Sequence, residues 1–111
     1  MRALSRGEVI RVLRPDGKGG FKERHVIVHK NAKEDDQVIS IYCTGENDGE
    51  DANNIFVEHQ SDAGVLMKLT KDTYIRATTI IIIKAIFVVR PIGTCPFMKE
   101  IAEIQDKHMA K

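Results

Sequence analysis

The chain has 111 residues and a mass of 12.5 kDa, with 42% hydrophobic and 30% charged residues, which is typical of one globular domain over residues 1–111 rather than a disordered protein. Two cysteines are too few for a disulfide framework, and no signal peptide is recognisable, so a reducing, cytoplasmic setting is expected. The longest apolar stretch, residues 80–89, is interrupted by Lys84 and is shorter than the ~20 residues of a membrane-spanning helix, so no membrane association is expected.

The net charge of +1 is distributed unevenly along the chain. Residues 1–24 carry a net charge of +4, residues 25–33 carry +2, residues 34–62 carry −9, and residues 63–111 carry +4. A polyanion could therefore bind the basic segments, whereas the acidic middle should face away from it or repel it. Aromatic residues make up only 5% of the chain, which weakens any interpretation based on base stacking.

The first half of the sequence predicts short strands separated by polar turns. Apolar, β-branched runs lie at residues 7–14, 25–30, 38–43 and 55–59, and polar or glycine-containing segments separate them. The run at 25–30 is apolar at both odd and even positions, so a central strand covered on both faces is expected. The loop at 15–20 is glycine-rich but lacks the spacing of a phosphate-binding P-loop.

The second half predicts more strand and one terminal helix. The β-rich stretch at 73–89 is too long for one strand and is expected to divide near Lys84. Thr94 is a predicted N-cap, and Phe97, Ile101 and Ile104 would form the apolar face of a helix. Together these elements predict a mainly β fold: a small, strongly bent β-barrel with a C-terminal helix.

Three side chains at or near strand ends could handle a phosphate. Arg24 and Arg76 offer guanidinium groups that bind two phosphate oxygens at once, and Thr44 offers a hydroxyl. Together they could hold a phosphodiester and stabilise the charge that develops on it during displacement. The alternative is that the arginines are ordinary surface residues and that Thr44 begins a turn.

Five motifs that include these residues follow one another along most of the chain. They are RGEVI at residues 6–10, RHVIV at 24–28, YCTG at 42–45, GVLMK at 64–68 running on to DTYIRA at 72–77, and IG at 92–93 before the terminal helix. In this order they resemble the MazF/PemK family, the endoribonuclease toxins of bacterial toxin–antitoxin systems. The resemblance implies a Src-homology-3-like barrel that forms homodimers in the cytoplasm, inhibits growth and is neutralised by a cognate antitoxin protein.

The same resemblance implies the chemistry and its residues. Members cleave single-stranded RNA, including mRNA, at selected sequences without a metal or other cofactor, by attack of the ribose 2′-hydroxyl, which leaves a 2′,3′-cyclic phosphate. The family's catalytic arginine and threonine fall on Arg24 and Thr44, and a second functional arginine falls on Arg76. RNA contacts are expected from basic or polar side chains of the same region: Arg76, Lys18, Lys22, Thr78 and His25.

This sequence departs from the family pattern at several positions. The usual proline after the arginine is His25, the apolar residue before Thr44 is Cys43, the following serine is Gly45, and the acidic residue of some members is Thr78. His25 could replace the missing base, since histidine titrates near neutrality, but neighbouring strand residues point to opposite faces, and a strand-end histidine is the alternative. The acidic loop at 46–51 is interpreted as solvated, as an antitoxin contact, or as a lid.

Two other function classes stay open. A degenerate or non-catalytic barrel of the same fold could act as a nucleic-acid or protein binding module, and Cys43 beside Thr44 could be a nucleophile, although a buried strand cysteine is the simpler interpretation. Residues 80–83 are expected to be buried in the core or in a dimer interface. Neither the RNA sequence recognised nor the antitoxin can be read from the chain.

Overall fold

The computed structural model describes residues 3–33, 36–45 and 53–109. The acidic loop at 46–51 lies outside these residues. The elements follow in the order β1 (Glu8–Pro15), β2 (Phe21–Val28), β3 (Val38–Thr44), β4 (Asn54–Val57), α1 (Asp62–Leu66), β5 (Thr73–Ile83), the 3₁₀ turn η1 (Ala85–Phe87), β6 (Val88–Thr94) and α2 (Met98–Met109).

All six strands belong to one antiparallel sheet with the order β4-β5-β3-β2-β1-β6. The protein is therefore mainly β with a C-terminal helix, as the sequence predicts. The prediction of a closed β-barrel is wrong, because the described residues of the two end strands, β4 and β6, do not pair with each other. The physical reason is that β4 has only four residues and pairs with β5 alone, while β6 pairs with β1 alone.

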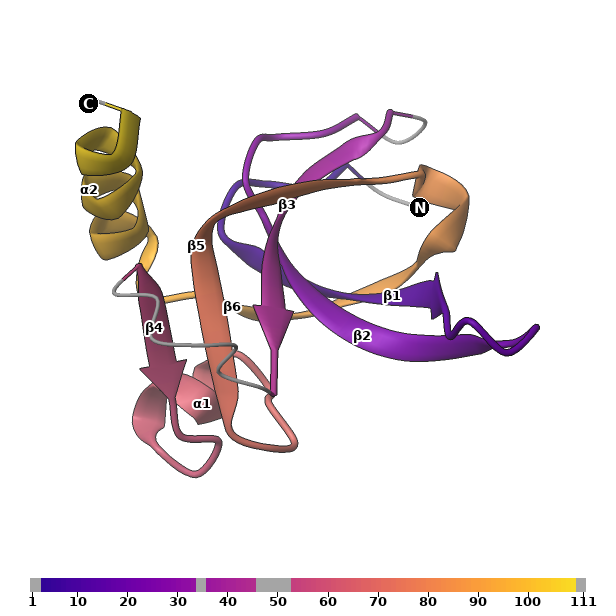
Figure 1. Ribbon diagram of the computed structural model, residues 1–111, viewed down its shortest axis with the longest axis horizontal. Coiled ribbons are helices and arrows are strands. Elements are labelled where there is room, and N and C mark those ends of the chain that lie inside the picture. The colour runs from indigo at the N-terminus through magenta and orange to yellow at the C-terminus, as the bar shows by residue number, and fades with distance from the viewer. Residues whose placement is uncertain (1–2, 34–35, 46–52, 110–111) are drawn as a thin grey trace.

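The sheet is nevertheless strongly bent, and β5 is where the bend is clearest (Figure 1). Along β3 the partner on β5 changes from Ile80, opposite Ile41, to Arg76, opposite Tyr42, so that residues 77–79 have no partner in this register. Such a bulge kinks a strand and increases its twist. The helix α2 covers the bulge, and the Gln105 side-chain amide donates to the Ala77 carbonyl at 2.9 Å.

The bend allows the sheet to bury two apolar clusters. Ile27 of β2 packs in one cluster with Ile41 of β3, and its neighbours Val26 and Val28 pack in the other. This confirms the prediction that the second strand is covered on both faces, although β2 begins at Phe21, four residues earlier than expected. The alternation of side chains along a strand explains why one strand serves both clusters.

The division of the long β-rich stretch is confirmed. β5 ends at Ile83, Lys84 caps η1, and β6 begins at Val88. The predicted helix N-cap at Thr94 is wrong, because Thr94 remains in β6 opposite Glu8 and the helix begins at Met98. The predicted apolar face of the helix is confirmed, since its residues Phe97, Ile101 and Ile104 belong to or pack against the cluster around Ile27.

Residues 61–64 form the start of the short helix α1. Ser61 is its N-cap, and the Ser61 hydroxyl accepts from the Gly64 amide at 3.1 Å. No helix among the described residues is long and apolar enough to span a membrane.

Candidate functional site

A pocket of about 720 Å³ opens where β2 and β3 separate. The two strands pair at only three positions, of which Val26 opposite Tyr42 is the last, because β2 then continues along β1 while β3 continues along β5. The segment that leads into β5 closes the far side. The described residues that line the pocket come from β1 (Arg11), β2 (Glu23, Arg24, His25), the end of β3 (Tyr42, Cys43, Thr44, Gly45) and residues 70–73 (Thr70, Lys71, Asp72, Thr73).

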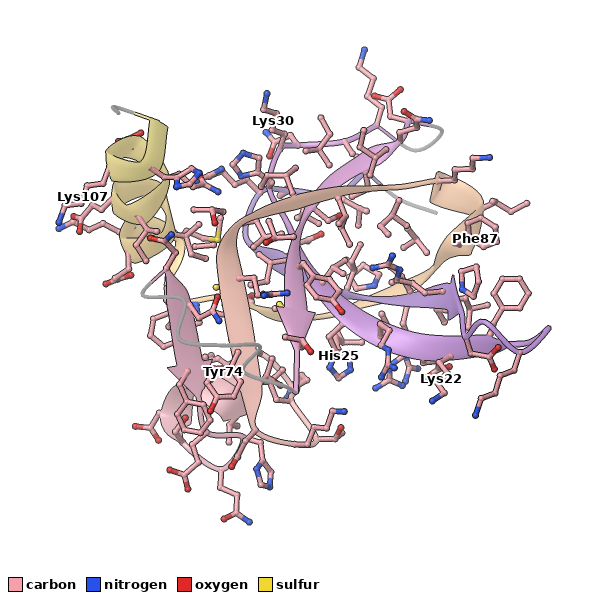
Figure 2. The ribbon with its side chains drawn as sticks, in the orientation of Figure 1. Lys22, His25, Lys30, Tyr74, Phe87 and Lys107 are labelled. Atoms are coloured by element: carbon pink, nitrogen blue, oxygen red, sulfur yellow. The ribbon has the colours of Figure 1, made fainter. Side chains whose placement is uncertain are left out.

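The structure brings together the two side chains that the sequence assigned to catalysis. Arg24 and Thr44, which are far apart in the sequence, both line the pocket. His25 lines it as well, although Arg24 and His25 are adjacent in β2 and were expected to diverge. Both residues border the pocket, and the β1–β2 register places Arg24 beside Val12 and His25 beside Arg11, on opposite faces of β2. Figure 2 shows His25 beside the end of β3.

The other predicted RNA contacts are not among the described lining residues. Arg76 lies on β5 opposite Tyr42 of β3, one position along the sheet from the pocket, and its Nε is buried. Thr78 lies in the β5 bulge, and Lys18 and Lys22 lie on the exposed loop and strand that follow β1. In the β3–β5 register Arg76 stands beside Tyr42, which lines the pocket, so Arg76 adjoins the pocket wall without being one of its described lining residues.

The pocket carries more positive than negative charge, and its acidic side chains are already engaged. Glu23 pairs with Arg11 at 3.5 Å. The Asp72 carboxylate accepts from the His59 backbone amide at 3.1 Å and lies 2.7 Å from His59 Nδ1. The hydrogen bonds from His59 hold the pKa of Asp72 below its usual range. Within the described part of the chain, the side chains of Arg24 and Lys71 form neither an ion pair nor a hydrogen bond, so they are the cations available to a ligand.

His25 is half-buried, and its environment favours the uncharged ring. Burial lowers the pKa of His25 from its ordinary value of 6.5, and the nearby positive charge of Arg11 lowers it further. A neutral imidazole at neutral pH can accept a proton, which a charged one cannot. His25 thus has the protonation state that a general base requires.

Cys43 forms part of the pocket wall but does not have the environment of a nucleophile. Its thiol is buried, and burial, followed by the neighbouring Cys95, raises its pKa well above the ordinary value. The pKa of the buried Cys95 is raised to about 11, again chiefly by burial. A thiolate is the reactive form of cysteine, so the Cys-dependent hydrolase hypothesis is not supported, and the prediction that Cys43 is a buried strand cysteine is confirmed.

Several lining residues were not predicted. Tyr42 carries the Arg14 guanidinium over its ring, 5.7 Å from the centroid, and Arg11 and Lys71 approach from β1 and from the segment before β5. Arg11 pairs with His25 in the β1–β2 register. That register would have predicted that Arg11 lines the pocket beside His25. No local pattern indicates Lys71, because its position depends on the long connection between β4 and β5.

Comparison with known proteins adds no assignment: no protein-family model and no curated protein matches the chain. Among the residues that the structure describes, no three or more His, Cys, Asp or Glu side chains gather into a group that could hold a metal ion.

Proposed function

We propose that the protein is a sequence-selective endoribonuclease toxin of the MazF/PemK type, with the bent sheet as an open form of the Src-homology-3-like architecture. The observation that carries the proposal is the shared pocket of Arg24, Thr44 and His25. A guanidinium, a hydroxyl and a neutral imidazole at one site are the groups that RNA cleavage by the 2′-hydroxyl requires.

The proposed reaction needs no metal ion. The RNA 2′-hydroxyl attacks the adjacent phosphorus while His25 accepts the hydroxyl proton, and the bond from phosphorus to the 5′-oxygen breaks. Arg24 stabilises the negative charge that develops on the phosphate oxygens, and Thr44 orients one of them. The 5′-oxygen takes a proton from water, and the products are a 2′,3′-cyclic phosphate and a 5′-hydroxyl. Because DNA lacks the nucleophile, it is not cleaved.

The partners follow from the same proposal. A second copy of the chain would cover the apolar side chains at the outer bend of the sheet, where Ile80, Ile82 and Ile86 are 42%, 62% and 83% exposed. This exposure differs from the burial expected in the core, and it favours the dimer-interface interpretation. The cognate antitoxin would neutralise the enzyme by placing acidic side chains against Arg24 and Lys71.

The test is cleavage of a long single-stranded RNA transcript of mixed sequence in the presence of EDTA. The wild type is expected to cleave it, whereas Arg24→Ala is expected to lose about 10²–10³ of the rate, as removal of one transition-state donor does in other enzymes. Lys107→Ala serves as the matched control, because Lys107 lies on α2 away from the pocket and is exposed (Figure 2). Retention of full activity by folded Arg24→Ala would contradict the proposal.

The second candidate is a non-catalytic RNA-binding module of the same fold. The cations Arg24 and Lys71 of the pocket could hold an RNA phosphate in such a module without any cleavage. The module predicts binding of single-stranded RNA by the wild type without cleavage at any enzyme concentration. Cleavage that depends on Arg24 excludes it.

A further inference from the structure

The wall of the pocket opposite β2 is formed by residues 70–73, just before β5 begins. Lys71 is the one cation in this stretch of sequence and is exposed. Lys71 and His25 of β2 both line the pocket. Lys71 therefore brings a charge to the side of the pocket that β2 does not reach.

The end of the Lys71 side chain lies close to Gly45. A Cβ atom built on Gly45 would be 3.3 Å from both Cε and Nζ of Lys71, so the ammonium end rests against the Gly45 backbone. Gly45 directly follows Thr44, and both line the pocket. The ammonium end thus lies against the residue that follows the candidate catalytic threonine in the chain.

The charges around Lys71 leave its ammonium group available. Asp72, its acidic neighbour, is held by His59, and Glu23 across the pocket is paired with Arg11. Among the described residues, the ammonium of Lys71 makes no ion pair or hydrogen bond. A cation in a pocket whose described acidic side chains are engaged by other residues is suited to an anionic ligand.

We propose that Lys71 is a phosphate-contacting residue that faces Arg24 across the pocket. The inference rests on the proposed function and adds the second phosphate clamp that the sequence had suggested for Arg76. The bound phosphodiester lies between the Arg24 guanidinium and the Lys71 ammonium, with the Thr44 hydroxyl between them. The guanidinium binds two oxygens in a fixed geometry, whereas the ammonium is a mobile point charge that follows the charge as it develops.

The residue at position 45 should affect the contact between Lys71 and the phosphate. A methyl group at Gly45 would press on the end of a flexible side chain rather than on backbone, so Lys71 can move away at little cost to the fold. Gly45→Ala should therefore weaken the phosphate contact without removing the charge. This gives a second, independent perturbation of the same interaction.

The experiment measures binding and cleavage separately. Binding is measured with a single-stranded RNA library of mixed sequence in which every 2′-hydroxyl is methylated, so that no cleavage occurs, and cleavage is measured with the unmodified transcript. Lys71→Ala is expected to weaken binding about 10-fold or more, the size of one charge-assisted hydrogen bond. It should also reduce the slope of log affinity against log salt by about 0.7, the value for one phosphate contact on a single strand.

The control variants separate the inference from a loss of folding. Lys71→Gln keeps a side chain of similar length without the charge and should behave as Lys71→Ala does. Gly45→Ala should show a smaller loss of affinity, and Lys107→Ala should show none. Thermal unfolding of each variant confirms that it is folded.

The failure of this inference and the failure of the proposed function give different results. If the wild type cleaves RNA and Arg24→Ala does not, but Lys71→Ala and Lys71→Gln retain wild-type affinity and salt slope, the Lys71 contact is overturned and the nuclease stands. If the wild type binds without cleaving and Lys71→Ala loses affinity, the contact stands and the nuclease is wrong. If the wild type neither binds nor cleaves, both are overturned.

Discussion

Gly64→Ala tests the backbone packing that positions the far wall of the pocket. Gly64 is a buried residue of α1, and an added Cβ would lie 2.3 Å from the Glu58 carbonyl oxygen and 2.5 Å from the His59 carbonyl oxygen. Real Cβ atoms essentially never approach within 3.0 Å of another atom, so the two backbone segments must separate by at least the difference, 0.7 Å. His59 is the residue that holds Asp72, so the disturbance extends toward the pocket.

The cost of Gly64→Ala follows from overpacking. Inserting a methyl group into a well-packed site costs about 1–3 kcal/mol, and the upper part of that range applies because both contacting atoms are backbone. The helix preference of alanine over glycine, up to ~1 kcal/mol, opposes this cost, but α1 has only five residues. Since about 1 kcal/mol lowers Tm by roughly 4–8 °C in a domain near this size, a decrease of roughly 5–15 °C is expected.

The assay for Gly64→Ala is thermal unfolding followed by circular dichroism, with Gly45→Ala as the matched control. Gly45 meets only the flexible end of Lys71, so Gly45→Ala should unfold within about 2 °C of the wild type, as surface substitutions usually do. If Gly64→Ala unfolds at the wild-type temperature, α1 does not pack against the Glu58–His59 backbone as described, and the argument for the far wall is refuted.

Three further predictions concern the pocket wall, its histidine and the helix. Cys43→Ala should retain RNA cleavage within about 3-fold of wild type, because burial keeps the thiol protonated; a loss of cleavage in a folded variant would revive the cysteine hypothesis. Folding lowers the pKa of His25 and of His29 below 6.5, so the unfolded chain binds more protons and stability should decrease as pH falls from 6.5 through the lowered values. Urea unfolding at about pH 7.5 and about pH 5.5 measures this, and His25→Asn should lose less stability over that interval. Ile101→Ala removes a fully buried side chain of α2 and should cost about 2–5 kcal/mol in the same unfolding assay; a cost below about 1 kcal/mol would contradict the packing of the helix.

Local patterns predicted the elements that depend on neighbouring residues. Alternating β-branched residues and Gly or Pro boundaries located β1 and β3, and the spacing of Phe97, Ile101 and Ile104 predicted the buried face of α2. The start of that helix was missed because Thr94 pairs with Glu8, a contact with the opposite end of the chain. The open edges of the sheet were missed for the same reason, since barrel closure depends on which distant strands pair.

In the candidate site as well, residues with a local sequence signal were predicted, whereas residues positioned by long-range packing were not. Arg24 and Thr44 were predicted from their positions at the ends of expected strands and from the motifs that contain them, and both line the pocket. Arg76 was placed at the site by its motif, and the bulge in β5 sets its register opposite Tyr42, beside the pocket wall. Lys71 was not predicted, since only the packing of the segment before β5 against Gly45 brings it there.

The central claim is that Arg24, Thr44 and His25 form one centre for attack by a 2′-hydroxyl. The most direct measurement places a single ribonucleotide within an otherwise 2′-deoxy oligonucleotide library in EDTA and analyses the ends of the products. The account predicts cleavage only after the ribonucleotide, a 2′,3′-cyclic phosphate end, and loss of the reaction in Arg24→Ala. Cleavage of the all-deoxy library, or products that carry a 5′-phosphate, would contradict it.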